Sequence, residues 1–151
     1  MLFNKTINSR IGYLRITANE NALLSISFID NNIDVAENTN LIIEETITQL
    51  NEYFEGKRKT FSVKLSPKGT DFQKQVWNEL LNIPFGKKAS YSDVAIAIGN
   101  PKAVRAIGNA NNKNPIPIII PCHRVIGKSG KLVGYASGLD IKIALLETET
   151  I

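Results

Sequence analysis

The stretch Asn114-Pro-Ile-Pro-Ile-Ile-Ile-Pro-Cys122-His123-Arg124 is the most informative part of this 151-residue chain. Its three prolines fix φ at their own positions and exclude helix on either side of a run of apolar residues. We therefore expect a stiff strand that ends at the only cysteine, with the only histidine directly after it. A side chain held as rigidly as this has the fixed position that a nucleophile requires.

Cys122 has two interpretations that the residues alone leave open. A single cysteine is commonly a small buried apolar residue. A cysteine that ionises is instead a nucleophile, and His123, Arg124 and a basic surrounding would all favour its thiolate. Because neighbouring side chains of a strand point to opposite faces, His123 could act on Cys122 only where the chain turns or through a water molecule.

The composition excludes several classes of protein. One cysteine forms no internal disulfide, and one cysteine with one histidine supplies too few ligands for an ordinary structural zinc site. The N-terminal residues lack the pattern of a signal peptide, and no apolar run approaches the roughly 20 residues of a membrane span. We expect a soluble, cytoplasmic, globular protein with no metal, no cofactor and no membrane partner.

Positive charge is concentrated in the second part of the chain. Residues 1–66 carry seven Lys/Arg against eight Asp/Glu, whereas residues 67–151 carry eleven against six. Between Lys68 and Lys131 there are ten basic and three acidic residues. Such a field attracts polyanions, although many proteins have a basic surface of this kind without binding one.

The pattern of apolar residues predicts an N-terminal α/β module over residues 1–66. Alternating apolar positions in the first thirty residues indicate antiparallel strands. From Asn40 to Phe54 the apolar spacing is helical, and Gly56 stands where a helix C-terminal cap belongs. Pro67 and Gly69 make the Ser66/Pro67 junction the expected boundary, and a purely structural role is our default for this module.

The second module, residues 67–151, is expected to be mainly helical. Thr70 and Gln73 form a predicted capping box, and a second helix should begin between Ser90 and Ser92 and end at Gly99. A third should have Asn100 as its cap and Pro101 as its first residue, and should end at Asn111 and Asn112. Two short helices joined by a tight turn favour a helix-turn-helix, with an ordinary helical hairpin as the alternative.

Three segments together resemble one known family. The string NPIPIIIPCHRVIG (114–127), with NPKAVRAIGNANNK (100–113) before it and GKLVGYASGLDIKIALL (130–146) after it, is similar to the signature region of the O6-alkylguanine-DNA alkyltransferases. These are also called methylated-DNA–protein-cysteine S-methyltransferases. The resemblance is dense from Thr70 to Glu149. It implies an α/β fold with an N-terminal ribonuclease-H-like module and a C-terminal domain whose helix-turn-helix binds the minor groove.

The resemblance implies direct repair of DNA by a protein that reacts once. The alkyl group of an O6-alkylguanine in double-stranded DNA would pass irreversibly to a cysteine after the base is flipped out of the duplex, and O4-alkylthymine is a second candidate substrate. We expect the protein to act as a monomer with no obligate protein partner.

The resemblance also assigns roles to residues. Cys122 would be the alkyl acceptor, His123 the water-mediated base and Glu149 the carboxylate that orients His123, with Glu147 as an alternative. Asn114 would tie the active-site segment to the preceding helix, Tyr91 would donate to the leaving guanine, and Arg105 would fill the space of the flipped base. The guanine pocket would be formed by Tyr135, Ala136, Ser137 and Gly138, and the main chain of Cys122 and Val125 would read the exocyclic amine.

Two other functions compete with this one. A non-catalytic alkyltransferase-like protein would bind damaged DNA without chemistry, but proteins of that kind lack the reactive cysteine that Cys122 supplies here. A Cys/His hydrolase usually has its two residues far apart in sequence. Ser137 also departs from the family, which more commonly has glycine there, so the loop is expected to be stiffer and bulky alkyl groups less well accepted.

Overall fold

The computed structural model describes residues 1–30, 37–130, 135 and 137–150. The chain forms two compact units, residues 1–68 and 69–151. In the described part, no helix is both long and apolar enough to cross a membrane.

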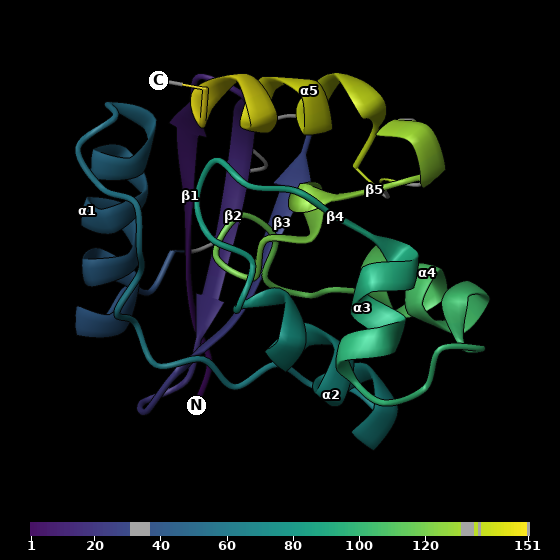
Figure 1. Ribbon diagram of the computed structural model, residues 1–151. Helices are drawn as coiled ribbons and strands as arrows, with labels where there is room; N and C mark the ends of the chain where they lie inside the picture. The colour runs from purple at the N-terminus through teal and green to yellow at the C-terminus, as the bar shows by residue number, and fades with distance from the viewer. Residues whose placement is uncertain (31–36, 131–134, 136, 151) are drawn as a thin grey trace. The chain divides into compact units, whose positions relative to one another are not determined.

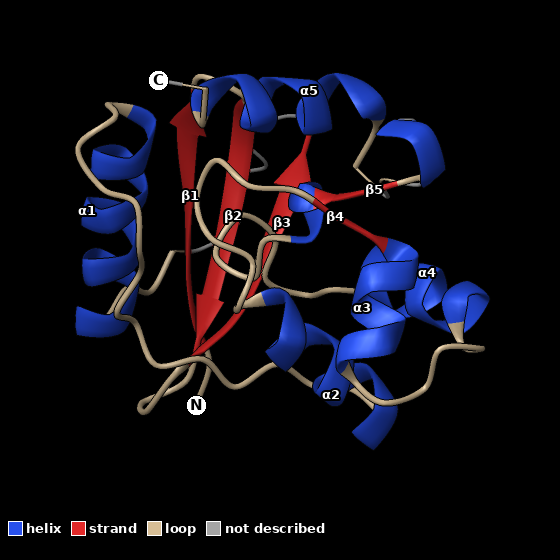
Figure 2. Cartoon of the chain, viewed as in Figure 1, coloured by secondary structure: helices blue, strands red, loops and turns tan. Residues whose placement is uncertain are grey.

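The first unit contains an antiparallel sheet of strands β1 (Phe3–Ser9), β2 (Gly12–Ala18) and β3 (Leu23–Ile29), in that order (Figure 2). Leu14, Ile16 and Ala18 of the middle strand are fully buried, and the residues between them are half-buried. This alternation is the side-chain period of a strand with one face on a core, so the strands expected from the first thirty residues are confirmed.

Helix α1 (Leu41–Phe54) packs against this sheet and buries Ile43, Leu50 and Tyr53 (Figure 1). The side chain of Asn40 caps the helix by accepting a hydrogen bond from Ile43 N at 3.0 Å. The predicted limits of this helix are confirmed, because it ends at Phe54 and Gly56 follows with a φ of 76°.

The second unit begins with helix α2 (Asp71–Leu80), whose predicted capping box between Thr70 and Gln73 is present. Trp77 is buried and donates through Nε1 to the main-chain oxygen of Ala110 at 2.8 Å, which links α2 to the helix that contains Ala110. Gly69 lies under the indole ring, where a Cβ atom would come within 2.4 Å of it. Only glycine therefore fits at this position.

Helices α3 (Tyr91–Ala97) and α4 (Val104–Asn112) pack against each other as the predicted helix pair (Figure 1). Ser90 caps α3 in a capping box with Asp93. The predicted start of the next helix is wrong: α4 begins after Ala103, which makes no side-chain cap, and Asn100 and Pro101 belong to the turn. The Asn100 main-chain oxygen instead accepts a bond from Ala103 N, which closes that turn.

The proline-rich stretch forms turns between α4 and Cys122, so the predicted strand is wrong. Ile118, fully buried, has a φ of 75°, a conformation that is strained for a β-branched residue. A 3₁₀ turn, η1 (Cys122–Arg124), follows, and strand β5 (Val125–Ile126) then pairs in parallel with β4 (Ala89–Ser90). The three prolines do exclude helix, but they leave turns as an alternative to strand.

The described chain ends with a second 3₁₀ turn, η2 (Lys128–Gly130), and helix α5 (Leu139–Thr148). Helix α5 contacts η1. Its last residues therefore lie within reach of the segment that contains Cys122 and His123.

Candidate active site

Main-chain and side-chain amide hydrogen bonds fix the segment that leads to Cys122. Its N–H donates to the Ile120 oxygen at 2.8 Å, and the Asn114 side chain donates to the same oxygen at 2.8 Å. Asn114 Oδ1 also accepts from Ile116 N at 2.9 Å. Asn114 thus bridges two points of the segment before Cys122 and fixes its course. Its role in tying this segment to the preceding helix stays a prediction.

His123 is fully buried, and its Nε2 lies 2.7 Å from Oε2 of Glu149 at the end of α5. A carboxylate only accepts hydrogen bonds, so Nε2 carries the proton in the neutral ring and Nδ1 has the free lone pair. Nδ1 is buried and has no hydrogen-bond partner in the described chain. The 3₁₀ turn, and not a strand, sets the direction of His123 relative to Cys122. Glu147 is exposed, so the geometry selects Glu149 of the two carboxylates.

The Glu149 carboxylate accepts from two further residues. Arg124 donates to it twice, from Nε to Oε1 at 2.8 Å and from Nη2 to Oε2 at 2.9 Å, and Gly86 N donates to Oε1 at 3.2 Å. A third Arg124 bond, from Nη1, reaches the Ile83 oxygen at 2.7 Å. Arg124 therefore fixes the position of the carboxylate that holds His123, a role that the sequence did not indicate.

Burial raises the pKa of the Cys122 thiol, and it outweighs the hydrogen bonds from Asn114 and Tyr135 and the charge of Lys142, which all lower that pKa. The expectation that Arg124 would favour the thiolate is not met, since its guanidinium is paired with Glu149. The positive charge of Lys142 does lower the pKa of the thiol, as expected of basic surroundings, but burial outweighs it. The resting group is the thiol, so the reaction needs a base.

Burial lowers the pKa of His123, against the hydrogen bond and the charge of Glu149, which raise it. The positive charges of Arg124 and Lys142 lower it further. His123 is consequently neutral near pH 7 and has a lone pair on Nδ1 that can take a proton. This is the state that a general base requires.

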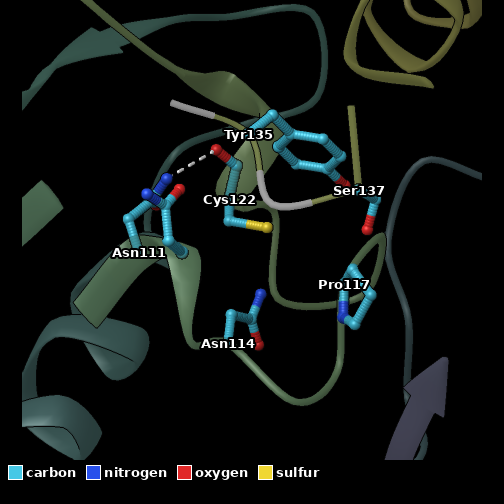
Figure 3. A pocket seen from close by; sticks show the side chains of 7 residues that line it. Asn111, Asn114, Pro117, Cys122, Tyr135 and Ser137 are labelled. Atoms are coloured by element: carbon cyan, nitrogen blue, oxygen red, sulfur yellow. Dashed lines mark hydrogen bonds between the residues drawn. The ribbon is translucent and has the colours of Figure 1, made fainter. Parts of the chain in front are cut away.

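The thiol borders a pocket whose described lining comes from the second unit: Asn111, Asn112, Asn114, Pro117, Cys122, Tyr135 and Ser137 (Figure 3). The enclosed space is about 20 Å³, which is on the order of one water molecule. Asn111 donates from Nδ2 to the main-chain oxygen of Cys122 at 3.4 Å, a contact that no sequence pattern indicated.

Lys142 is a second residue that the sequence analysis missed. It is fully buried in α5, and its Nζ donates to the Val125 oxygen at 2.6 Å and lies 5.9 Å from the centre of the Tyr135 ring. A buried lysine is rare unless it is paired. The only indication in the sequence was that Lys142 lies in GLDIKIALL, part of a segment that resembles the family's signature region.

Of the remaining predicted residues, all but Ala136 are described by the structure, and Arg105 does not line the pocket. Tyr91, at the first position of α3, is half-buried, and burial together with the charge of a Cys122 thiolate raises its pKa, so the hydroxyl keeps its proton. Val125 begins β5, and Gly138, with a φ of 104°, precedes α5 and donates from N to the Tyr135 oxygen at 3.0 Å. Arg105 is exposed on α4 and does not line the pocket. Ala136 lies outside the described residues.

Among the residues that the structure describes, no group of three His, Cys, Asp or Glu side chains could hold a metal ion. The polar groups around Cys122 can instead take up a proton and position a thiol.

Fold and site together define a protein of two units, a small α/β unit followed by a mainly helical unit in which a buried cysteine adjoins a histidine held by a carboxylate. The chain belongs to the 6-O-methylguanine DNA methyltransferase family, since the model of that family's DNA binding domain matches residues 71–151 and the model of its ribonuclease-like domain matches residues 2–67. The predicted fold class, a ribonuclease-like α/β module followed by a helical domain, is confirmed.

Individual relatives agree with this assignment. The methylated-DNA--protein-cysteine methyltransferase of Methanosarcina barkeri is 48% identical over 98% of this chain and 97% of its own. The constitutive enzyme of that name from Bacillus subtilis is 56% identical over 72% of this chain and 67% of its own. Among solved structures, Mycobacterium tuberculosis OGT in complex with DNA is 44% identical, with a TM-score of 0.88 over 97% of this chain and 91% of that chain.

Proposed function

We propose that this protein repairs DNA by direct reversal, taking the alkyl group of O6-alkylguanine irreversibly onto Cys122. One observation carries the proposal: the only cysteine of the chain lies beside a pocket, directly before a buried histidine that a carboxylate holds at 2.7 Å. DNA is the partner, as it is for the solved structure bound to DNA.

The reaction follows from the charge states of the site. Nδ1 of His123 takes the proton of the Cys122 thiol, directly or through one water molecule, while Glu149 stabilises the imidazolium that forms. The sulfur then attacks the alkyl carbon, a C–S bond forms, and the electron pair of the C–O bond leaves with the base. Tyr91 keeps its proton at neutral pH and is the group that donates to the base as this charge develops.

The helix pair provides the surface for DNA. On α4 the exposed side chains include the small residue Ala106, with Arg105 and Asn109 beside it. A helix with so little bulk can lie close to the floor of a minor groove, and an arginine there can enter the space of a base that has left the stack. The enclosed space beside Cys122 is far smaller than a purine, so the pocket must widen as the base enters.

The product determines how often each molecule reacts. A thioether has no low-energy route of hydrolysis, and the chain has no second cysteine to accept the group. Each molecule therefore acts once.

We expect the protein to act as a monomer. Because the acceptor must be a reduced thiol, the protein works in the cytosol. Every residue described in the pocket lining belongs to the second unit, which leaves a structural role for the first.

The test is incubation with an oligonucleotide that contains O6-methylguanine, followed by mass analysis of the peptide that contains Cys122. We expect one added CH₂ on that peptide and an amount of repaired DNA equal to the amount of protein. Binding of the damaged DNA without a modified peptide would instead identify a non-catalytic damage-binding protein. Repeated turnover without added thiol would contradict the single-reaction mechanism.

A further inference from the structure

The connection between α2 and β4 contains a tight turn that contacts both members of the buried ion pair. Lys87 N donates to the Pro84 oxygen at 3.0 Å, and Gly86, the third residue of this turn, has a φ of 77°. A positive φ at the third position is typical of a type II turn and favours glycine. We call residues 83–87 the carboxylate turn.

Glu149 needs support from outside its own helix. Helix α5 ends at Thr148 and Glu149 is its C-cap, a position where helices fray readily. Its side chain is nevertheless only 1% exposed, and its Oε2 lies 2.7 Å from Nε2 of His123. Contacts from other segments therefore fix this carboxylate.

The carboxylate turn supplies such contacts to both members of the ion pair. Gly86 N donates to Oε1 of Glu149 at 3.2 Å, and the Ile83 oxygen accepts from Nη1 of Arg124 at 2.7 Å. Cζ of Arg124 also lies 5.9 Å from the centre of the Phe85 ring. Because the turn holds the guanidinium, Arg124 has a fixed position from which it donates twice to Glu149.

The turn also occupies a place in which a side chain at Gly86 would not fit well. A Cβ atom there would lie 3.3 Å from the main-chain oxygen of Glu149. A residue other than glycine would in addition have to keep a φ that such residues rarely adopt. A turn that moves away from Glu149 relieves the contact and the strain, but it lengthens the hydrogen bond from Gly86 N.

We propose that Gly86 is a positioning residue of the reaction: its N–H and its missing side chain let the carboxylate turn close on Glu149, which then holds His123 in the tautomer with a free Nδ1. Gly86 is outside the described lining of the pocket and acts through Glu149. This inference rests on the proposed function, because it concerns the base of that reaction. Hydrogen bonds to charged groups are stronger than those between neutral groups, so loss of this one should be measurable.

The first measurement is the single-turnover rate constant on a duplex that contains O6-methylguanine. Gly86→Ala should lower it at least about tenfold, the factor that corresponds to about 1.4 kcal/mol. Gly12→Ala is the matched control, since Gly12 also has a positive φ, of 112°, but a Cβ atom there would meet open space at the start of β2. The control should stay within about twofold of the wild-type rate.

The second measurement reads the tautomer of His123 and needs no DNA. The chain has one histidine, so the ring nitrogen NMR signals of the untagged protein belong to that residue alone. At neutral pH the wild type and Gly12→Ala should show only the tautomer with the proton on Nε2, whereas Gly86→Ala should show both. A glycine needed only for folding would change the stability and leave the tautomer as it is.

Gly86→Asn separates the contact with Glu149 from the backbone strain. Asparagine tolerates a positive φ better than alanine does, so this variant keeps the backbone of the carboxylate turn but still places a Cβ atom against Glu149. It should also react more slowly than the wild type and show both tautomers. Should Gly86→Ala not fold, Gly86→Asn takes its place in both measurements.

Two outcomes would overturn the inference: Gly86 variants that react as fast as the wild type, or variants that react slowly while His123 keeps the wild-type tautomer. The second outcome would make Gly86 a support for the fold only. Absence of reaction with O6-methylguanine in the wild type would contradict the proposed function instead. The tautomer measurement would then still decide whether Gly86 fixes His123.

Discussion

The two sides of the Cys122–His123 turn differ in how completely their polar groups are paired. On the carboxylate side, Glu149 accepts from His123, Arg124 and Gly86, and Arg124 also donates to the Ile83 oxygen. On the pocket side, Oδ1 of Asn111 has no partner among the described residues. The same holds for Nδ1 of His123, the ring nitrogen that does not contact Glu149.

The paired groups around Glu149 hold His123 in place, whereas the unpaired atoms remain available for the reaction. A fully paired buried network has one arrangement and fixes His123 in one tautomer, as a base requires. Under the proposed function, the unpaired Nδ1 of His123 takes up the proton of Cys122, and Asn111 lines the pocket beside the thiol. The following four experiments alter one side at a time.

The largest effect is expected from Cys122→Ala, on the pocket side. It should abolish transfer completely and leave DNA affinity intact, because under the proposed function binding should rest on Lys and Arg contacts to phosphate and on Arg105. Transfer to a labelled oligonucleotide and an electrophoretic shift measure the two properties. Loss of DNA binding in this variant would mean that Cys122 supports the fold and is not only the acceptor.

On the carboxylate side, Glu149→Gln should cost about 3–5 kcal/mol of unfolding free energy, because it leaves the buried Arg124 guanidinium without its counter-charge. Urea unfolding measures this. Glu52→Gln is the matched control: it removes an ion pair with Arg58 in which both side chains are partly exposed, and should cost less than about 1 kcal/mol. Equal losses in the two variants would show that the paired network is no more stabilising than a surface pair.

Alkylation of Cys122 should lower stability by about 1–3 kcal/mol, because added carbon atoms in a closely packed site force their neighbours to move. The space beside the thiol is about 20 Å³, so a benzyl group should destabilise more than a methyl group. Thermal melting before and after stoichiometric reaction measures both shifts. An unchanged midpoint with the benzyl group would show that the pocket wall yields without strain.

The smallest effect concerns pH. Burial lowers the pKa of His123 below its ordinary value of about 6.5, so the rate should stay constant from pH 8 to about 6.5 and fall only below that value. The unfolded chain takes up this proton at higher pH than the folded one, so stability should also decline as pH falls below about 6.5. Single-turnover rates and urea unfolding between pH 5 and 8 test this. A rate that already falls above pH 6.5 would show that Glu149 outweighs burial.

Local patterns in the sequence were sufficient for α1, for the start of α2 and for the three-stranded sheet. The capping box at Thr70, the apolar spacing of residues 40–54 and the alternation around Leu14 and Ile16 each act within a few residues, and each prediction is confirmed. The predicted start of α4 was wrong, because Asn100 and Pro101 are as common in turns as at the start of a helix.

The residues around Cys122 were identified by resemblance, but their chemistry depended on tertiary structure. The sequence by itself determined that one cysteine and one histidine are adjacent and that prolines exclude helix before them. Only the folded chain brings Glu149 to His123 across 26 positions and Arg124 to the same carboxylate. Only burial raises the pKa of the Cys122 thiol and lowers the pKa of His123. Burial and long-range pairing depend on packing between distant segments, and no local pattern encodes them.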